Sequence, residues 1–191
     1  MWRPSQEGRA CRAWPSGLLE PRWRELRRKA GGGARPISCS TIVGSGLGHV
    51  PVVDASVVVD WVSPDADDAL PAVGVLARLA KDEAEVLAPR LLLQEVANVL
   101  LSGVRGKRWS GVAADRAFAL LRDLPIRLAE EPEDLHRAWE LARRYDEHPI
   151  YDMLYVALAE RHETQFVTAD RKLRNRLIGL EWIVSPEQFA R

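Results

Sequence analysis

Four carboxylates in this sequence stand where helices or strands are expected to begin or end: Asp54, Glu95, Asp152 and Asp170. Carboxylates brought together repel one another strongly unless a cation neutralises them. A set of ligands made only of oxygen atoms favours a hard cation such as Mg²⁺ or Mn²⁺. We therefore interpret the four acids as a candidate site for a divalent metal ion.

Asp54 ends the apolar run Pro51-Val52-Val53. Because polar residues do not alternate within this run, it is typical of a parallel strand buried on both faces. A carboxylate at the carboxyl end of such a strand lies where open α/β sheets bind their ligands. The alternative is that Asp54 caps the helix that follows, a role for which Ser56 is a second candidate.

Glu95 is expected on a helix whose same face carries Leu92 and Val99. An unpaired carboxylate is costly to bury, so a glutamate on this apolar face needs a partner or a metal ion. The alternative partner is an arginine in a buried salt bridge. Asn98, one turn further on, can orient the carboxylate by a hydrogen bond, or it can face solvent.

Asp152 lies in the first turn of a predicted helix, with Tyr155 and Val156 continuing its face. The helix dipole alone favours an acid in the first turn, which is the alternative explanation for Asp152. Asp170 follows a predicted strand that contains Thr168. Its alternative role is an N-cap, and Thr168 can be an ordinary β-branched strand residue.

Other catalytic chemistries find little support in the sequence. The histidines are scattered, which argues against zinc, and no Ser-His-Asp or Cys-His arrangement is apparent. Both cysteines, Cys11 and Cys39, precede residue 50, so the rest of the chain fits a reducing compartment and we expect a cytoplasmic protein. No apolar run approaches the roughly 18 residues of a membrane span.

Strands and helices alternate from Pro51 onward. Strands are expected up to Asp54 and at 86–88, 126–128, 165–168 and 181–184, and helices at 56–62, 67–82, 90–102, 110–122, 132–145, 150–162 and 170–178, with a terminal turn at 186–190. Ser110 is a candidate N-cap. The alternation predicts an α/β fold, a three-layer α/β/α sandwich around a mostly parallel sheet of four to five strands.

Residues 1–49 differ in composition from the rest of the chain. They contain four prolines and the run Gly31-Gly32-Gly33, and residues 1–50 carry a net charge of +6 against −6 for residues 51–191. We predict a disordered basic extension at 1–49 and one domain at 50–191. The abrupt change also favours translation that starts near Val50. The acidic domain argues against a protein that coats duplex nucleic acid, but not against a nuclease, because metal ions supply positive charge.

From about Val50 to its end, the chain resembles the PIN domain, specifically the VapC-like ribonuclease toxins of bacterial toxin–antitoxin pairs. The matching pieces are Val53-Asp54-Ala55-Ser56, Leu93-Gln94-Glu95-Val96-Ala97-Asn98, Tyr151-Asp152-Met153-Leu154-Tyr155-Val156-Ala157-Leu158-Ala159 and Val167-Thr168-Ala169-Asp170-Arg171-Lys172-Leu173. Each piece is short, and the four in this order are what makes the resemblance specific. The extension at 1–49 departs from it.

The resemblance implies a single-strand-specific RNA endonuclease that depends on Mg²⁺ or Mn²⁺. It implies Asp54 and Asp152 as the principal metal ligands, with Glu95 and Asp170 completing the acidic cluster. The supporting polar groups that it implies are Ser56, Asn98 and Thr168. It further implies a homodimer and a cognate antitoxin that blocks the acidic pocket.

RNA cleavage also needs a base for the attacking water and cations for the phosphates. A carboxylate that is not fully occupied by metal can take the proton, and Glu95 and Asp170 are the candidates. Two basic groups can hold phosphates, or can simply be solvated charge. They are Arg105, Lys107 and Arg108, which precede Trp109, and the pair Arg171 and Lys172 after Asp170.

A phosphatase and a binding module are the two alternatives to a nuclease. A phosphatase of the haloacid-dehalogenase type also begins with an acid after its first strand, but it needs a second aspartate where this chain has Ser56. A binding module could engage an antitoxin-like partner without turnover. The presence of all four acids favours the nuclease, and a thermal shift that depends on metal would separate the two.

Overall fold

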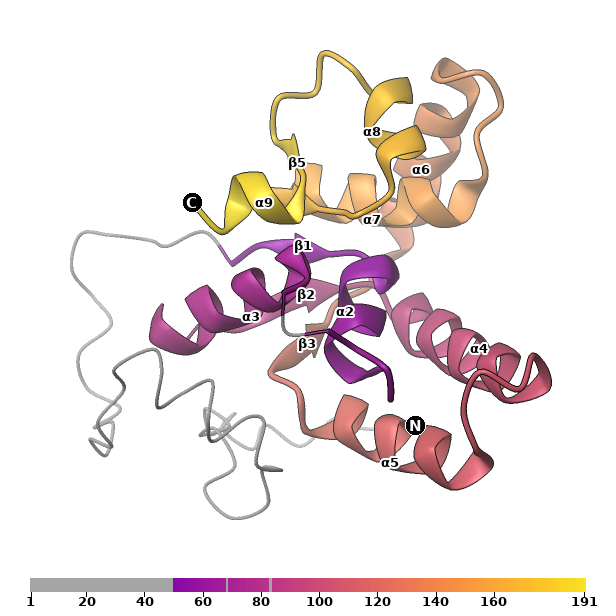
Figure 1. Ribbon diagram of the computed structural model, residues 1–191. Coiled ribbons are helices and arrows are strands. Elements are labelled where there is room, and N and C mark those ends of the chain that lie inside the picture. The colour runs from indigo at the N-terminus through magenta and orange to yellow at the C-terminus, as the bar shows by residue number, and fades with distance from the viewer. Residues whose placement is uncertain (1–49, 68, 83) are drawn as a thin grey trace, which may run out of the picture.

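The computed structural model describes residues 50–67, 69–82 and 84–191 (Figure 1). The predicted disordered extension at 1–49 lies outside these residues. A single five-stranded sheet runs through the described part, in the order β3-β2-β1-β4-β5 and with every pair parallel. Its strands are β1 (Val52–Val53), β2 (Val86–Ala88), β3 (Ile126–Leu128), β4 (Phe166–Val167) and β5 (Ile183–Val184). The prediction of a mostly parallel sheet of four to five strands is confirmed.

Helices cover both faces of this sheet. They are α2 (Ala55–Val62), α3 (Pro71–Asp82), α4 (Leu91–Arg105), α5 (Gly111–Asp123), α6 (Pro132–Arg144), α7 (Ile150–Arg161), α8 (Arg171–Arg176) and α9 (Pro186–Phe189). Figure 1 shows α6 and α7 on one side of the strands and α2 and α3 on the other, so the predicted α/β/α sandwich is confirmed. None of the helices described is both long and apolar enough to cross a membrane.

The central strands are completely buried, as their unbroken apolar runs predict. Val52 and Val53 of β1 have no exposed surface, and neither does Phe166 of β4. The ring of Tyr155, on α7, stacks against Phe166 with ring centroids 5.8 Å apart. This stacking fixes the position of α7 over β4.

Helix α4 is longer than predicted. Of the two glycines that can mark its end in the sequence, Gly103 lies inside the helix and Gly106 is its C-cap. The helix continues to Arg105, and the indole of Trp109 packs directly on Gly103. A Cβ atom built on Gly103 would lie 2.0 Å from Cζ2 of Trp109. The glycine therefore permits close packing between the helix and the chain that follows it. The next helix begins as predicted, with Ser110 accepting a capping hydrogen bond from the backbone N–H of Ala113.

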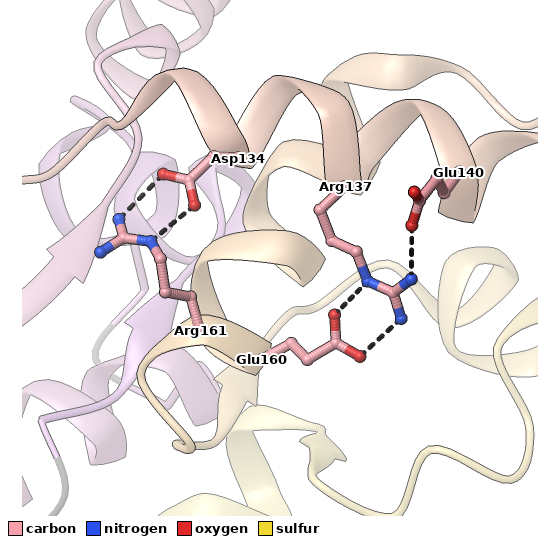
Figure 2. A network of polar contacts seen from close by, with 5 residues as sticks. All are labelled: Asp134, Arg137, Glu140, Glu160 and Arg161. Atoms are coloured by element: carbon pink, nitrogen blue, oxygen red, sulfur yellow. Dashed lines mark hydrogen bonds and ion pairs between the residues drawn. The ribbon is translucent and has the colours of Figure 1, made fainter.

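Ion pairs connect α6 to α7, the helix that carries Asp152 (Figure 2). Arg161 donates from Nε and from a terminal nitrogen to the two carboxylate oxygens of the buried Asp134, at 2.6 and 2.8 Å. Arg137 makes a second, more exposed bridge to Glu160, at 2.5 and 2.8 Å. The two bridges fix α7 against α6, and the stacking of Tyr155 on Phe166 fixes it against the sheet.

Candidate active site

The topology of the sheet places the carboxyl ends of β1 and β4 side by side. From β1 the chain adds β2 and β3 on one side, and the connection from β3 to β4 then crosses to the other side of β1, so the direction of strand addition reverses at β1. Ligands bind in open α/β sheets at such a reversal of strand order. Val53 is paired with Val167, and Asp54 and Thr168 are therefore the first residues beyond the ends of the two strands.

The carboxylate of Asp54 is held by two hydroxyl groups. Its Oδ2 atom accepts hydrogen bonds from Ser56 Oγ at 2.8 Å and from Thr168 Oγ1 at 2.6 Å. The hydroxyls are held in turn by backbone donors, since Ala169 N donates to Ser56 and Asp170 N donates to Thr168. Both hydroxyl residues that the sequence indicated as supporting groups thus contact Asp54.

The side chain of Asp54 makes no capping hydrogen bond to α2, although its backbone occupies the N-cap position. Burial raises the pKa of its carboxyl, and the charge of Asp152 raises it further. The hydrogen bonds from Thr168 and Ser56 act in the opposite direction. The net effect is a raised pKa for Asp54, and a cation nearby would favour its charged form.

Glu95, on α4, has a tyrosine as its partner instead of the arginine considered from the sequence. The hydroxyl of Tyr155 donates to Glu95 Oε2 at 2.5 Å. Burial raises the pKa of Glu95, the hydrogen bond from Tyr155 lowers it, and the charges of Asp54 and Asp152 raise it again. Asn98 is exposed on α4, so Tyr155 takes the orienting role that was considered for the asparagine.

Tyr155 is suited to hold this carboxylate because it cannot easily lose its proton. Burial and the nearby charge of Glu95 both raise the pKa of Tyr155. Its hydroxyl therefore stays protonated and acts as a donor. The buried ring, stacked on Phe166, fixes where that donor lies.

Asp152 lies in the first turn of α7, as predicted, and is in contact with His148. The distance from His148 Nε2 to Asp152 Oδ2 is 2.7 Å, and the side chain of His148 is only 13% exposed. The charge of Asp152 acts on both Asp54 and Glu95. The acid on α7 is thus close enough to the acids at the end of β1 and on α4 to raise the pKa of both.

The side chain of Asp170 serves as the N-cap of α8. Its Oδ1 atom accepts hydrogen bonds from the backbone N–H groups of Lys172 at 2.7 Å and Leu173 at 3.1 Å. Its connection to Asp54 runs through its own backbone N–H, which donates to Thr168. Of the two roles that the sequence left open for Asp170, the structure therefore shows the cap.

The donor set suits a hard divalent cation. Among the described residues, no group of three or more His, Cys, Asp or Glu side chains is already positioned to hold a metal ion. Burial raises the pKa of Asp54 and of Glu95, and the charge of Asp152 raises both further, so a cation at this place would favour their charged forms. All three offer oxygen, the ligand that Mg²⁺ and Mn²⁺ prefer.

The first basic group lies at the end of α4 and is largely engaged within the protein. Arg108 donates to Asp65 at 2.6 Å and stacks over the ring of Trp109, with its guanidinium carbon 4.9 Å from the ring centroid. Arg105 donates to Ser102 Oγ at 2.8 Å. Lys107 is exposed. Trp109, which follows this basic group, packs on Gly103 of α4 and donates to the carbonyl of Leu100.

The second basic group follows Asp170 directly. Arg171 and Lys172 are exposed at the start of α8. Arg174, one turn further on, donates to the backbone carbonyl of Thr168, whose hydroxyl contacts Asp54. Arg174, on the same helix as this group, is therefore connected to the acidic site through Thr168.

The sequence did not reveal Tyr155 and His148 as parts of the site. Tyr155 follows Asp152 by three residues, a helical spacing that could have indicated it, but its apolar body explained its burial equally well. His148 precedes Pro149, outside the predicted helix, so no helical spacing placed it beside Asp152. Its contact depends on the turn between α6 and α7.

Comparison with known proteins gave one family match. The family model described as PIN domain matches residues 52–176 of the chain. No curated protein matches the sequence significantly.

Proposed function

The chain belongs to the PIN domain family, whose members are generally metal-dependent nucleases, and we propose that it is a single-strand-specific endoribonuclease dependent on Mg²⁺ or Mn²⁺. The observation that carries this proposal is the gathering of Asp54, Glu95 and Asp152, where burial raises the pKa of the first two and neighbouring carboxylates raise it further. A divalent cation held there supplies activation of water and neutralisation of charge on the phosphoryl oxygens.

The protein's own residues divide between holding the ion and orienting its ligands. Asp54 and Asp152 are the principal ligands in this proposal. Ser56 and Thr168 limit the rotation of Asp54, since both donate to the same oxygen. Tyr155 limits the rotation of Glu95 in the same way.

Glu95 is the better of the two candidate bases. A general base works best when its pKa lies near the working pH, and the pKa of Glu95 is raised by burial and by neighbouring charge. Asp170 has one carboxylate oxygen engaged by two backbone donors. In this proposal Glu95 takes the proton from the attacking water, and Asp170 fixes the start of α8 beside the site.

The basic groups provide contacts for the RNA backbone. Arg171 and Lys172 are exposed beside Asp170, where they can hold a phosphate next to the acidic cluster. Lys107 is exposed at the end of α4, and Arg105 and Arg108 lie next to it. Contacts to phosphates bind RNA without selecting its sequence.

We further propose that the protein is the toxin of a toxin–antitoxin pair, acts in the cytoplasm as a homodimer and is inhibited by a cognate antitoxin over the acidic pocket. Exposed apolar side chains support a partner-binding role. They include Val99 and Leu101 on α4, and Leu135 and Trp139 on α6. The remaining alternative is a binding module that engages such a partner without turnover.

RNA cleavage by the purified full chain tests the nuclease directly. Single-stranded and structured RNAs and single-stranded DNA are incubated with Mg²⁺, Mn²⁺ or a chelator. We expect only single-stranded RNA to be cut, and only with metal. Asp152→Asn should abolish cutting, whereas Asp115→Asn, the same change on the exposed face of α5, should leave it intact.

Two results would count against the nuclease. Cleavage that persists in the chelator, or in Asp152→Asn, would show that the acidic cluster is not the active site. Absence of cleavage together with absence of a metal-dependent thermal shift would favour the binding module.

A further inference from the structure

We infer that His148 is a positioning residue that fixes the carboxylate of Asp152 for cation binding. This inference rests on the proposed metal-dependent function. It concerns the contact between His148 Nε2 and Asp152 Oδ2, which spans 2.7 Å and joins residues four positions apart. His148 itself precedes α7, whereas Asp152 lies in the first turn of that helix.

The hydrogen bond indicates which ring nitrogen carries the proton. The Nδ1 atom of His148 is buried and has no hydrogen-bond partner in the structure. With the proton on Nε2, the ring donates to Asp152 and leaves only an acceptor unpaired. With the proton on Nδ1 alone, the buried Nδ1–H donor would have no acceptor. The unprotonated Nε2 and Oδ2 of Asp152 would then be two acceptors only 2.7 Å apart.

The two residues that lead into His148 have an unfavourable backbone conformation. Asp146 and Glu147, which immediately precede His148, both have left-handed φ angles, of 58° and 54°. Residues other than glycine rarely have φ angles in this region, and two such residues in succession are less common still. Strained residues of this kind cluster at functional sites, and these two lead directly from the end of α6 into His148.

His148 also completes a pattern at the site. Each of the three converging carboxylates has one oxygen bound by a side-chain donor. Ser56 and Thr168 bind Oδ2 of Asp54, and Tyr155 binds Oε2 of Glu95. His148 does the same for Oδ2 of Asp152, so that every carboxylate keeps a fixed orientation.

Loss of the His148 side chain should lower the affinity of the site for a divalent cation. Groups that orient metal ligands typically change affinity or activity by about 10–100-fold when they are removed. We therefore expect His148→Ala to weaken Mn²⁺ binding by about 10–100-fold. His148→Gln keeps an N–H donor at a similar distance from the backbone, and it should restore affinity to within a few-fold of the unmodified protein.

Mn²⁺ titration of the full chain measures this effect without any enzymatic assay. His136→Ala is the matched control, because His136 is exposed on α6. Circular dichroism checks that each variant is folded. Affinity of His148→Ala within about two-fold of that of the unmodified protein would overturn the inference, and so would failure of His148→Gln to bind better than His148→Ala.

A second readout needs no metal at all. The ¹⁵N chemical shifts of the histidine rings in the metal-free protein should show a proton on Nε2 of His148, and Asp152→Asn should alter that signal. A ring without a proton on Nε2 would overturn the inference and leave the nuclease proposal standing. If the unmodified protein shows the proton on Nε2 but binds no Mn²⁺, the proposed metal-dependent function fails, and the positioning role fails with it.

Discussion

The hydroxyl of Tyr155 donates to Glu95 Oε2, so that a residue on α7 orients a carboxylate on α4, 60 positions earlier in the chain. The two helices flank the carboxyl end of β1, where Asp54 lies. The ring of Tyr155 is fully buried against Phe166. The core of the sheet thus determines the position of one acid of the candidate site.

Removing this hydroxyl should weaken both the fold and the site. We expect Tyr155→Phe to lower the free energy of unfolding by about 1–2 kcal/mol at neutral pH, because a hydrogen bond to a charged, partly buried carboxylate is lost. Urea denaturation measures the change. Tyr151→Phe, on the exposed first turn of α7, is the matched control and should have no effect. Equal stability of the two variants would show that the contact contributes nothing.

Neutralising Asp54 should stabilise the metal-free protein. Burial raises the pKa of Asp54, so its ionised form costs free energy in the folded state. Between the ordinary carboxyl pKa and the raised value, the folded protein binds more protons than the unfolded one, and stability therefore falls as pH rises. At neutral pH we expect Asp54→Asn to raise the Tm by about 2–4 °C.

The pH dependence separates this effect from simple repacking. The Tm difference between Asp54→Asn and the unmodified protein should be small near pH ~4, the ordinary range of the carboxyl, and should grow as pH rises through the raised pKa. Added Mn²⁺ should reverse the order at neutral pH, because only the ionised Asp54 binds it well. A difference that does not change with pH would contradict this account.

The two bridges between α6 and α7 should differ sharply in their contribution to stability. Asp134 is 4% exposed and would be left as an unpaired buried charge by Arg161→Ala, so we expect a loss of about 2–4 kcal/mol. Arg137→Ala removes a bridge whose partners are 39% and 41% exposed, and it should cost under about 1 kcal/mol. Chemical denaturation of both variants tests the contrast, and equal losses would refute it.

Gly103 should tolerate no side chain despite its position within a helix. In Gly103→Ala the new Cβ would displace the indole of Trp109, which donates from Nε1 to the carbonyl of Leu100 at 2.9 Å, and we expect a loss of about 1–3 kcal/mol. Gly111→Ala is the matched control, because a Cβ there meets nothing within 4 Å. The control should be neutral or slightly stabilising. Thermal unfolding that ranks the two variants in the opposite order would contradict the packing seen around Trp109.

The local sequence pattern correctly predicted the strands and helices that position the site. The apolar run before Asp54 and the strand before Thr168 placed both residues at the carboxyl ends of parallel strands, and pairing of those strands brings them together. Alternating strands and helices predicted the sandwich. The end of α4 was predicted too early, at Ser102 instead of Arg105. Two glycines, Gly103 and Gly106, could mark this end, and it is Gly106 that caps the helix, because Trp109 packs on Gly103 in a way not visible in the local sequence.

The partners of the acids could not be predicted in the same way. Tyr155 meets Glu95 only after α4 and α7 have packed on the sheet, and the contact spans 60 positions. His148 reaches Asp152 through two left-handed residues, Asp146 and Glu147, and of these only the aspartate is a residue type that often takes this conformation. For Asp170 the sequence allowed both an N-cap and a metal ligand, and only the backbone geometry of α8 showed the cap.

Binding of Mn²⁺ to the full chain, measured by isothermal titration, tests most directly whether the three converging acids form a cation site. We predict saturable binding that is weakened more than about 100-fold in Asp54→Asn and is unchanged in the exposed control Asp115→Asn. Absence of binding, or equal binding by Asp54→Asn and the unmodified protein, would contradict the assignment of this site.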